Sequence, residues 1–100
     1  MRICRVIGKA QATVKHASME GVRLLVLREL DLGAKPTGGI CLAVDAVGAG
    51  EGETVAVSQG SAAAKALAGR ETPVDSVVIA IIDTVSVDGK EIYSRKEEKK

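Results

Sequence analysis

Three glycines at alternate positions give one stretch of this chain, VDAVGAGEGETV, the look of a nucleotide-binding loop. A dinucleotide fingerprint, G-x-G-x-x-G, that began at Gly48 and Gly50 would need a third glycine where the chain has Glu53. A P-loop needs a lysine before its Ser or Thr, and here Glu53 precedes Thr54. The glutamates of the loop would repel a phosphate, and the strand expected next offers an anion no helix N-terminus. We therefore interpret Gly48, Gly50 and Gly52 as a structural turn that requires positive φ or close backbone approach.

The other residues with reactive side chains do not form a recognisable site. His16 is the only histidine, and it could in principle activate Cys4 or Cys41 as a nucleophile, but no spacing supports such a pair. One histidine and two separated cysteines are too few ligands for a zinc site. Two isolated cysteines in apolar surroundings are typical of reduced, buried thiols rather than a disulfide.

Three aspartates, Asp45, Asp75 and Asp83, are candidates for paired catalytic carboxylates. Each is instead expected at a strand end or turn, where Asp accepts hydrogen bonds from backbone N–H groups. The sequence therefore predicts no catalytic residue, no cofactor and no metal, and the chain is not expected to be an enzyme.

Length and composition indicate one small domain with an aliphatic core. The chain has 100 residues, of which 27 are Val, Ile or Leu, and its only aromatic residue is Tyr93. The formal net charge is +1, so no strong field attracts nucleic acid or an anionic membrane. We expect neither a signal peptide in MRICRVIGKA nor a membrane span, since no apolar run approaches the roughly 20 residues a spanning helix needs. A single domain is expected over residues 1–94, followed by a charged, solvated tail at 95–100.

Alternating apolar residues and turn residues indicate that the elements are mostly strands. Strands are expected at 1–14 with a bulge at Gly8, and at 22–30, 40–47, 54–58, 74–87 and 90–94. Pro36 and three glycines are expected to exclude regular structure from 31–39, Asp88–Gly89 is a hairpin signal, and 61–69 is the one expected helix. This pattern predicts an all-β fold: a small, closed, five- to six-stranded barrel like the OB-fold, with one short helix.

Two of the expected strands are apolar on both faces, although successive side chains of a strand point in opposite directions. A small barrel has one dry interior, so the outer faces of such strands need a cover. The C-terminal hairpin or the helix could cover one, and a neighbouring subunit is the natural cover for the other. The alternative is full coverage within the chain. The candidate interface residues are Leu24, Leu25, Val26, Leu27, Val77, Val78, Ile79, Ile81 and Ile82.

Binding of single-stranded nucleic acid is the main alternative function for an OB-like barrel. Such barrels stack bases on aromatic side chains in a basic groove. A chain with one tyrosine, no Phe, no Trp and little net charge lacks these platforms, so this alternative is disfavoured.

Three motifs, in the same order along the chain, resemble the EutN/CcmL family of bacterial microcompartment vertex proteins. They are D-x-V-G-A-G-x-G-E in the glycine loop, the G-S-A-A segment at 60–63, and P-V-D-x-x-V-x-A-I-I-D at 73–83. The likeness also extends to RVIGKAQATVK and GVRLLVLRELD, so it spans nearly the whole chain.

The resemblance implies a structural protein without enzymatic activity. Family members are OB-like barrels that form cyclic pentamers and fill the vertices of a polyhedral shell in the bacterial cytoplasm, beside hexameric shell proteins. By the resemblance, Asp45 and Glu53 fix the ends of the glycine loop near subunit contacts. Cys41 and the GAKPTGG turn lead us to expect a catabolic compartment (ethanolamine, propanediol or glycyl-radical) rather than a carboxysome.

In such a ring, one loop from each subunit must approach the five-fold axis. We expect Ser58, Gln59, Gly60 and Ser61 to lie there, because Gly60 has no side chain to clash and its neighbours are polar without charge. Charged side chains repeated around a narrow opening would repel one another. The competing candidate is the glycine loop, where Glu51 would form an acidic ring.

Overall fold

The computed structural model describes residues 1–11, 21–60 and 75–95, and these form an all-β fold. Five strands make a closed barrel in the order β1-β2-β3-β5-β4, and two more form a separate hairpin. The barrel strands are β1 (Arg2–Ala10), β2 (Leu24–Leu30), β3 (Pro36–Asp45), β4 (Thr54–Gln59) and β5 (Ser76–Ile81). The hairpin strands are β6 (Thr84–Val87) and β7 (Lys90–Ser94). The expected closed barrel is confirmed, whereas the helix expected at 61–69 lies outside the described residues.

Two local features agree with the sequence pattern. The register of β1 against β2 shifts between Val6 and Gly8, which places the expected bulge at the glycine. At the hairpin tip, both Asp88 and Gly89 have positive φ, 51° and 79°, as a two-residue turn of the primed type requires.

The expectation of no regular structure over residues 31–39 is wrong at its end, because β3 begins at Pro36. A proline is tolerated at the first position of a strand, where it removes no needed ladder donor. Gly39 leaves room for the Glu29 side chain, since a Cβ at this position would lie 2.5 Å from a Glu29 Oε atom and the glutamate would have to move.

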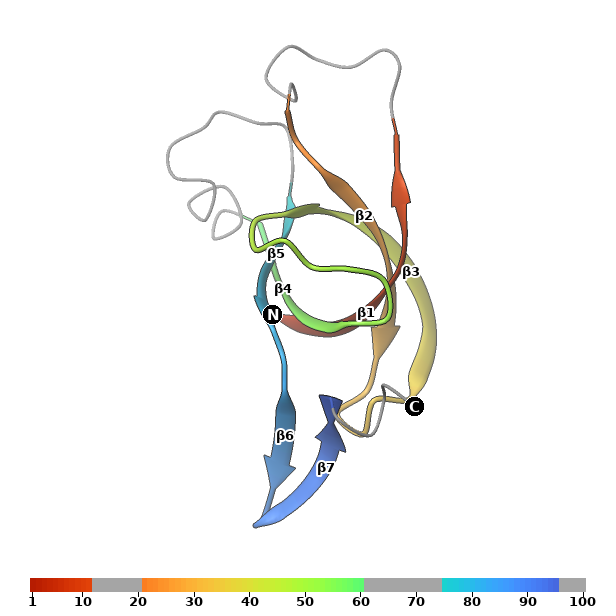
Figure 1. The fold of residues 1–100 in the computed structure, drawn as a ribbon. Helices are drawn as coiled ribbons and strands as arrows, with labels where there is room; N and C mark the ends of the chain where they lie inside the picture. Colours follow the sequence, from red (N-terminus) through yellow and green to blue (C-terminus); the bar gives the residue numbers. More distant parts are fainter. Residues whose placement is uncertain (12–20, 61–74, 96–100) are drawn as a thin grey trace.

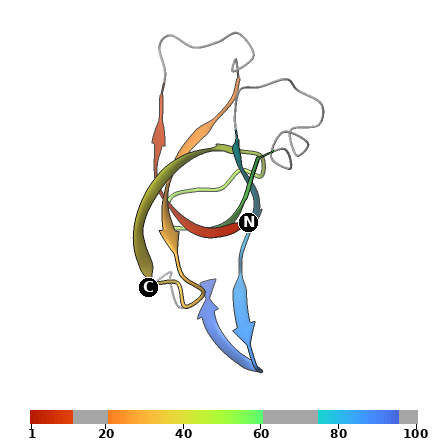
Figure 2. The same ribbon diagram turned by 180° about the vertical axis from the view of Figure 1, so that it is seen from behind.

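The single long strand expected at 74–87 is also wrong, because the chain is interrupted after Ile81. The Ile82 N–H donates to the Thr54 carbonyl at 2.8 Å, and the chain then leaves the barrel wall to form β6. The hairpin projects away from the barrel in both views (Figures 1 and 2). Apolar content alone could not show where the strand stops contributing to the barrel.

The side chains that point inward fill the barrel. They form one buried cluster consisting of Cys4, Val6, Leu25, Leu27, Ala43, Ala49, Val55, Val57 and Val78. A second cluster lies on the opposite face of the same strands, with Val44 and Val77 buried and Val22, Leu24 and Ile79 packed against them. The expectation that β2 and β5 are apolar on both faces is therefore confirmed.

Candidate subunit-contact surfaces and the glycine loop

The glycine loop is organised around the carboxylate of Asp45, which stands at the end of β3. Its Oδ1 accepts hydrogen bonds from the N–H groups of Val47, Gly48 and Ala49 at 3.0–3.2 Å. Its Oδ2 accepts from Arg23 at 3.0 Å, and the Asp45 side chain is only 1% exposed. The positive φ of Gly48, 79°, lets the chain wrap around this oxygen.

Glu53 holds the other end of the loop. Its Oε1 accepts from the Gly50 N–H at 2.6 Å, and its Oε2 accepts from Arg95 at 2.6 Å. Arg95 also contacts Asp83 through its guanidinium at 3.2 Å and through its backbone N–H at 2.7 Å. Glu53, Arg95 and Asp83 therefore link the loop to the base of the β6–β7 hairpin, and Arg95 is not part of a solvated tail.

This geometry explains why the loop is unsuited to a phosphate. Four successive N–H groups, from residue 47 to residue 50, already donate to the carboxylates of Asp45 and Glu53. A phosphate would have to compete with two anions that the chain itself supplies. The loop is a structural element that joins β3, β4 and the hairpin.

The residues considered for catalysis are not assembled into a catalytic site. Asp45 accepts hydrogen bonds from the backbone of the glycine loop, and Asp83 forms an ion pair with Arg95. His16 lies outside the described residues. Among the residues that the structure describes, no group of three or more His, Cys, Asp or Glu side chains could hold a metal ion. In the same ranges, no helix is long and apolar enough to cross a membrane.

The two cysteines are free thiols that meet inside the barrel. Cys4 is fully buried, and Cys41 packs against the same cluster. Burial, reinforced by the neighbouring Cys41 thiol, raises the pKa of Cys4 to about 11. Because the thiolate is the nucleophilic form, Cys4 is held in its unreactive state.

We predict that native protein is alkylated at Cys4 by iodoacetamide far more slowly than urea-unfolded protein. With a pKa of about 11, only about one Cys4 thiol in a thousand is ionised at pH 8. Folding raises this pKa, so the unfolded chain loses the Cys4 proton at lower pH than the folded chain. The free energy of unfolding should therefore be unaffected by Cys4 below about pH 9 and should fall as the pH rises toward 11. Mass spectrometry of labelled peptides measures the rate, and labelling of native Cys4 as fast as in the unfolded chain would contradict the burial.

The candidate interface residues divide between the two faces of the wall. Leu25, Leu27 and Val78 belong to the barrel interior, so they are core residues. The outward-facing candidates are Leu24, Val77 and Ile79 in the second cluster, and Val26, which is half-buried. Ile81 packs partly against the interior cluster, and Ile82 lines the groove described below.

Two residues that the sequence reasoning missed are the most exposed apolar side chains of the barrel wall. Ile40 and Leu42 on β3 are 63% and 53% exposed. The register places Leu42 opposite Val26, and cross-strand partners share a face, so these residues continue the outer apolar surface. The unbroken apolar run ICLAV carried the same signal that identified β2 and β5.

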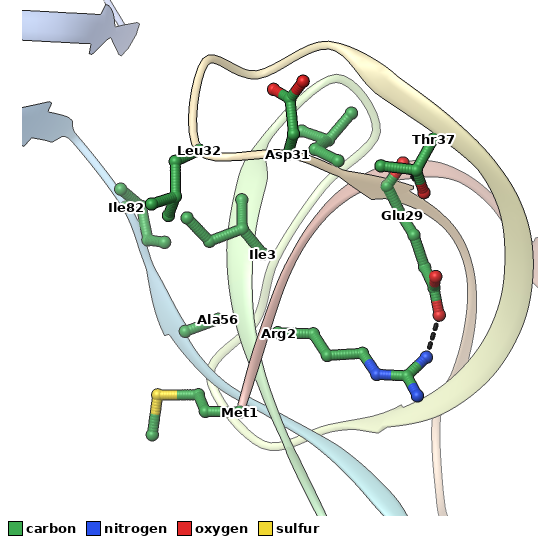
Figure 3. Close-up of a pocket in the computed structure, with 10 residues that line it drawn as sticks. Met1, Arg2, Ile3, Glu29, Asp31, Leu32, Thr37, Ala56 and Ile82 are labelled. Atoms are coloured by element: carbon green, nitrogen blue, oxygen red, sulfur yellow. Dashed lines mark hydrogen bonds and ion pairs between the residues drawn. The ribbon is translucent and has the colours of Figure 1, made fainter.

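An open groove of about 690 Å³ lies on the outer wall near the hairpin (Figure 3). Apolar side chains, among them Ile3, Leu32 and Ile82, form much of its lining, and the Arg2–Glu29 ion pair lies at one side. Its polar lining residues include Glu29, Asp31 and Thr37.

The residues considered for the five-fold axis follow β4. Ser58 is buried, whereas Gln59 and Gly60 are exposed, and Ser61 lies outside the described residues. Gly60 has a φ of 68°, and its N–H donates to the Asp75 carbonyl at 2.8 Å. The turn at Gly60 is therefore fixed to the segment that leads into β5.

Both the sequence and the fold of this chain are similar to those of known shell proteins. The family model described as "Ethanolamine utilisation protein EutN/carboxysome" matches residues 1–83. The carboxysome shell vertex protein CcmL of Gloeobacter violaceus is 45% identical over 98% of this chain and 98% of its own length. The solved structure of that protein superposes with a TM-score of 0.90 at 46% identity, covering 96% of this chain and 99% of the other.

Two further relatives are named as microcompartment shell proteins rather than as carboxysome proteins. The shell vertex protein EutN of Salmonella typhimurium is 35% identical, covering 95% of this chain and 96% of its own length. The structure of GrpN, a pentameric microcompartment shell protein from Rhodospirillum rubrum, superposes with a TM-score of 0.79 at 39% identity, covering 87% of this chain and all of the other.

Proposed function

Because this chain belongs to the EutN/CcmL family of bacterial microcompartment shell vertex proteins, we propose that its outer apolar surfaces join five identical subunits into the ring that closes a shell vertex. It is a structural shell protein rather than an enzyme. Its place is in the shell of a microcompartment within the cytoplasm.

The observation that carries the interface proposal is the apolar outer face of β2, β3 and β5. Val26, Leu42 and Ile79 lie on this face and not in the barrel interior. A closed ring requires a heterologous contact, in which two different patches of each subunit meet. Apolar surface on the outer wall, together with the groove near the hairpin, supplies such patches.

The nucleic-acid alternative has little physical support. Tyr93, the only aromatic residue, is 5% exposed and cannot act as a stacking platform. The loop that might have bound a nucleotide phosphate is filled by Asp45 and Glu53.

The comparisons do not favour the expected catabolic compartment over a carboxysome. The carboxysome vertex protein of Gloeobacter violaceus shares 45% identity, against 35% for the ethanolamine protein. The two features that suggested a catabolic type have structural explanations, since Cys41 packs against the core and Pro36 begins β3. Neither of them reports on the enclosed enzymes.

As partners beyond the ring itself, we propose the hexameric proteins of the shell facets. Within the ring, we propose that Ser58, Gln59, Gly60 and Ser61 line the five-fold axis. Gln59 and Gly60 are exposed and uncharged, which suits a narrow opening where five copies converge.

Native mass spectrometry of the purified chain tests the assembly, and a species of five 10.3 kDa chains is expected. A monomer at micromolar concentration would contradict the proposed function. The structure of the pentamer then tests the axis. The Cα of Gly60 should lie closer to the five-fold axis than the Cα of Gly50, and the reverse order would favour an acidic ring at Glu51.

A further inference from the structure

Among the described residues, one edge of β3 is unpaired along most of its length, although the barrel closes through a short β3–β5 pairing. This strand pairs with β2 along its length, but with β5 only at Val44 and Asp45. The Asp45 N–H donates to the Arg23 carbonyl on the β2 side. Backbone N–H and C=O groups of successive residues point to opposite edges of a strand. Those of residues 42 and 40 therefore point to the edge of β3 that faces away from β2. In the described part of the chain, no strand pairs with that edge between Pro36 and Ala43.

The open edge lacks the features with which soluble proteins protect a free strand. From Thr37 to Ala43 it carries no proline and no charged residue. The two side chains beside the unpaired backbone groups, Ile40 and Leu42, are the exposed apolar residues of the wall. An apolar edge of this length is a template for a strand from another chain.

The β6–β7 hairpin is a matching element. Among the described residues, its two strands pair only with each other, so each has a free outer edge. Val87 and Ile92 are exposed on it, although a two-stranded hairpin is at best marginally stable in water. Arg95 fixes its base to the barrel through Glu53 and Asp83, so the hairpin is held in one direction as it projects outward (Figure 1).

The charges on the two elements are complementary. Arg28 is exposed on the outer face of β2 and pairs in register with Ile40 on β3. The hairpin carries Asp88 and Glu91 against a single lysine, Lys90. An acidic hairpin that approached the β3 edge would therefore meet the positive charge of Arg28.

We propose that the β6–β7 hairpin of one subunit adds to the free edge of β3 in the neighbouring subunit. The inference rests on the pentamer of the proposed function and names the contact that builds it. Each subunit donates one hairpin and accepts one, which is the heterologous arrangement that a closed ring requires. The occupant of the edge is a second copy of this chain.

Two variants separate the accepting edge from the donating hairpin. Leu42→Pro removes an N–H from the free edge without removing a bond to β2, and Leu42→Thr is its control because it keeps the N–H. Val87→Asp combined with Ile92→Asp places charge on the hairpin, and threonine at the same two positions is the control. Far-UV circular dichroism checks folding, and Ile40→Pro replaces Leu42→Pro if the latter fails to fold.

Native mass spectrometry of each variant and of their mixture tests the proposal. Each variant alone should be a monomer, while the threonine controls remain pentamers. Mixed in equal amounts, the two variants should form a one-to-one dimer and nothing larger. The unchanged hairpin of the proline variant can bind the unchanged β3 edge of the aspartate variant, and the remaining edge and hairpin of the dimer are both altered. A folded proline variant that stays pentameric, or a mixture that stays monomeric, would overturn the contact. A wild-type chain that is not a pentamer would instead contradict the proposed function.

Discussion

Replacing Asp45 by alanine is expected to lower the free energy of unfolding by about 2–4 kcal/mol, because it removes the acceptor of three backbone N–H groups at once. Ala49, which supplies one of these N–H groups, is fully buried, so water cannot replace the lost bond there. The groups of Val47 and Gly48 are more exposed and can be hydrated after a small movement of the loop. The cost should therefore be smaller than three full desolvation penalties.

Asp45→Asn provides a matched control within the same site. Asparagine keeps one carbonyl oxygen for the loop N–H groups and loses the charge that faces Arg23. Because the Arg23 side chain is about half exposed, its guanidinium can turn to water, and the asparagine variant should be less destabilised than the alanine variant. Urea unfolding at one fixed protein concentration measures both variants. An alanine variant within about 0.5 kcal/mol of wild type would show that the loop does not depend on this carboxylate.

The pattern of apolar residues was sufficient to predict the barrel because its strands bury one face in the interior. The alternation of Leu25 and Leu27 with their neighbours, and the glycine at the β1 bulge, are local signals that the structure confirms. The hairpin tip at Asp88 and Gly89 is likewise a local signal, since few residues accept its positive φ values.

Features that depend on distant contacts could not be predicted in this way. The break after Ile81 arises where the Ile82 N–H meets Thr54 and where Arg95 meets Asp83. These contacts join residues that are remote in the sequence, and no window of neighbouring residues contains them.

The sequence identified two strands of the candidate contact surface but not which of their side chains face outward. Apolar character on both faces identified β2 and β5, yet it could not say which member of each pair points inward. The register supplies that answer, with Leu27 inside and Val26 outside. The same reasoning, applied to ICLAV, would have found Ile40 and Leu42.

Val26 and Leu27 are adjacent on β2, and aspartate at the two positions should have opposite consequences. Leu27 is fully buried in the barrel, so Leu27→Asp places a carboxylate without a partner among apolar side chains. Such a charge costs several kcal/mol, which is a large part of the stability of a small domain, and the chain should not fold. Loss of the far-UV circular dichroism of the barrel and of cooperative unfolding measures this outcome.

Val26→Asp should instead leave the barrel folded and dissociate the ring. The half-buried Val26 side chain lies on the outer face opposite Leu42, where the carboxylate of a separate subunit can still reach water. In the assembled ring, the proposed contact would bury that charge without a partner, at a cost of about 2–5 kcal/mol per interface. This corresponds to a weakening of each subunit contact by a factor of about 30 or more. Val26→Thr, which has nearly the same shape, should remain pentameric. Native mass spectrometry measures the outcome. A Val26→Asp chain that is folded and still pentameric would show that the outer face of β2 is not part of the subunit contact.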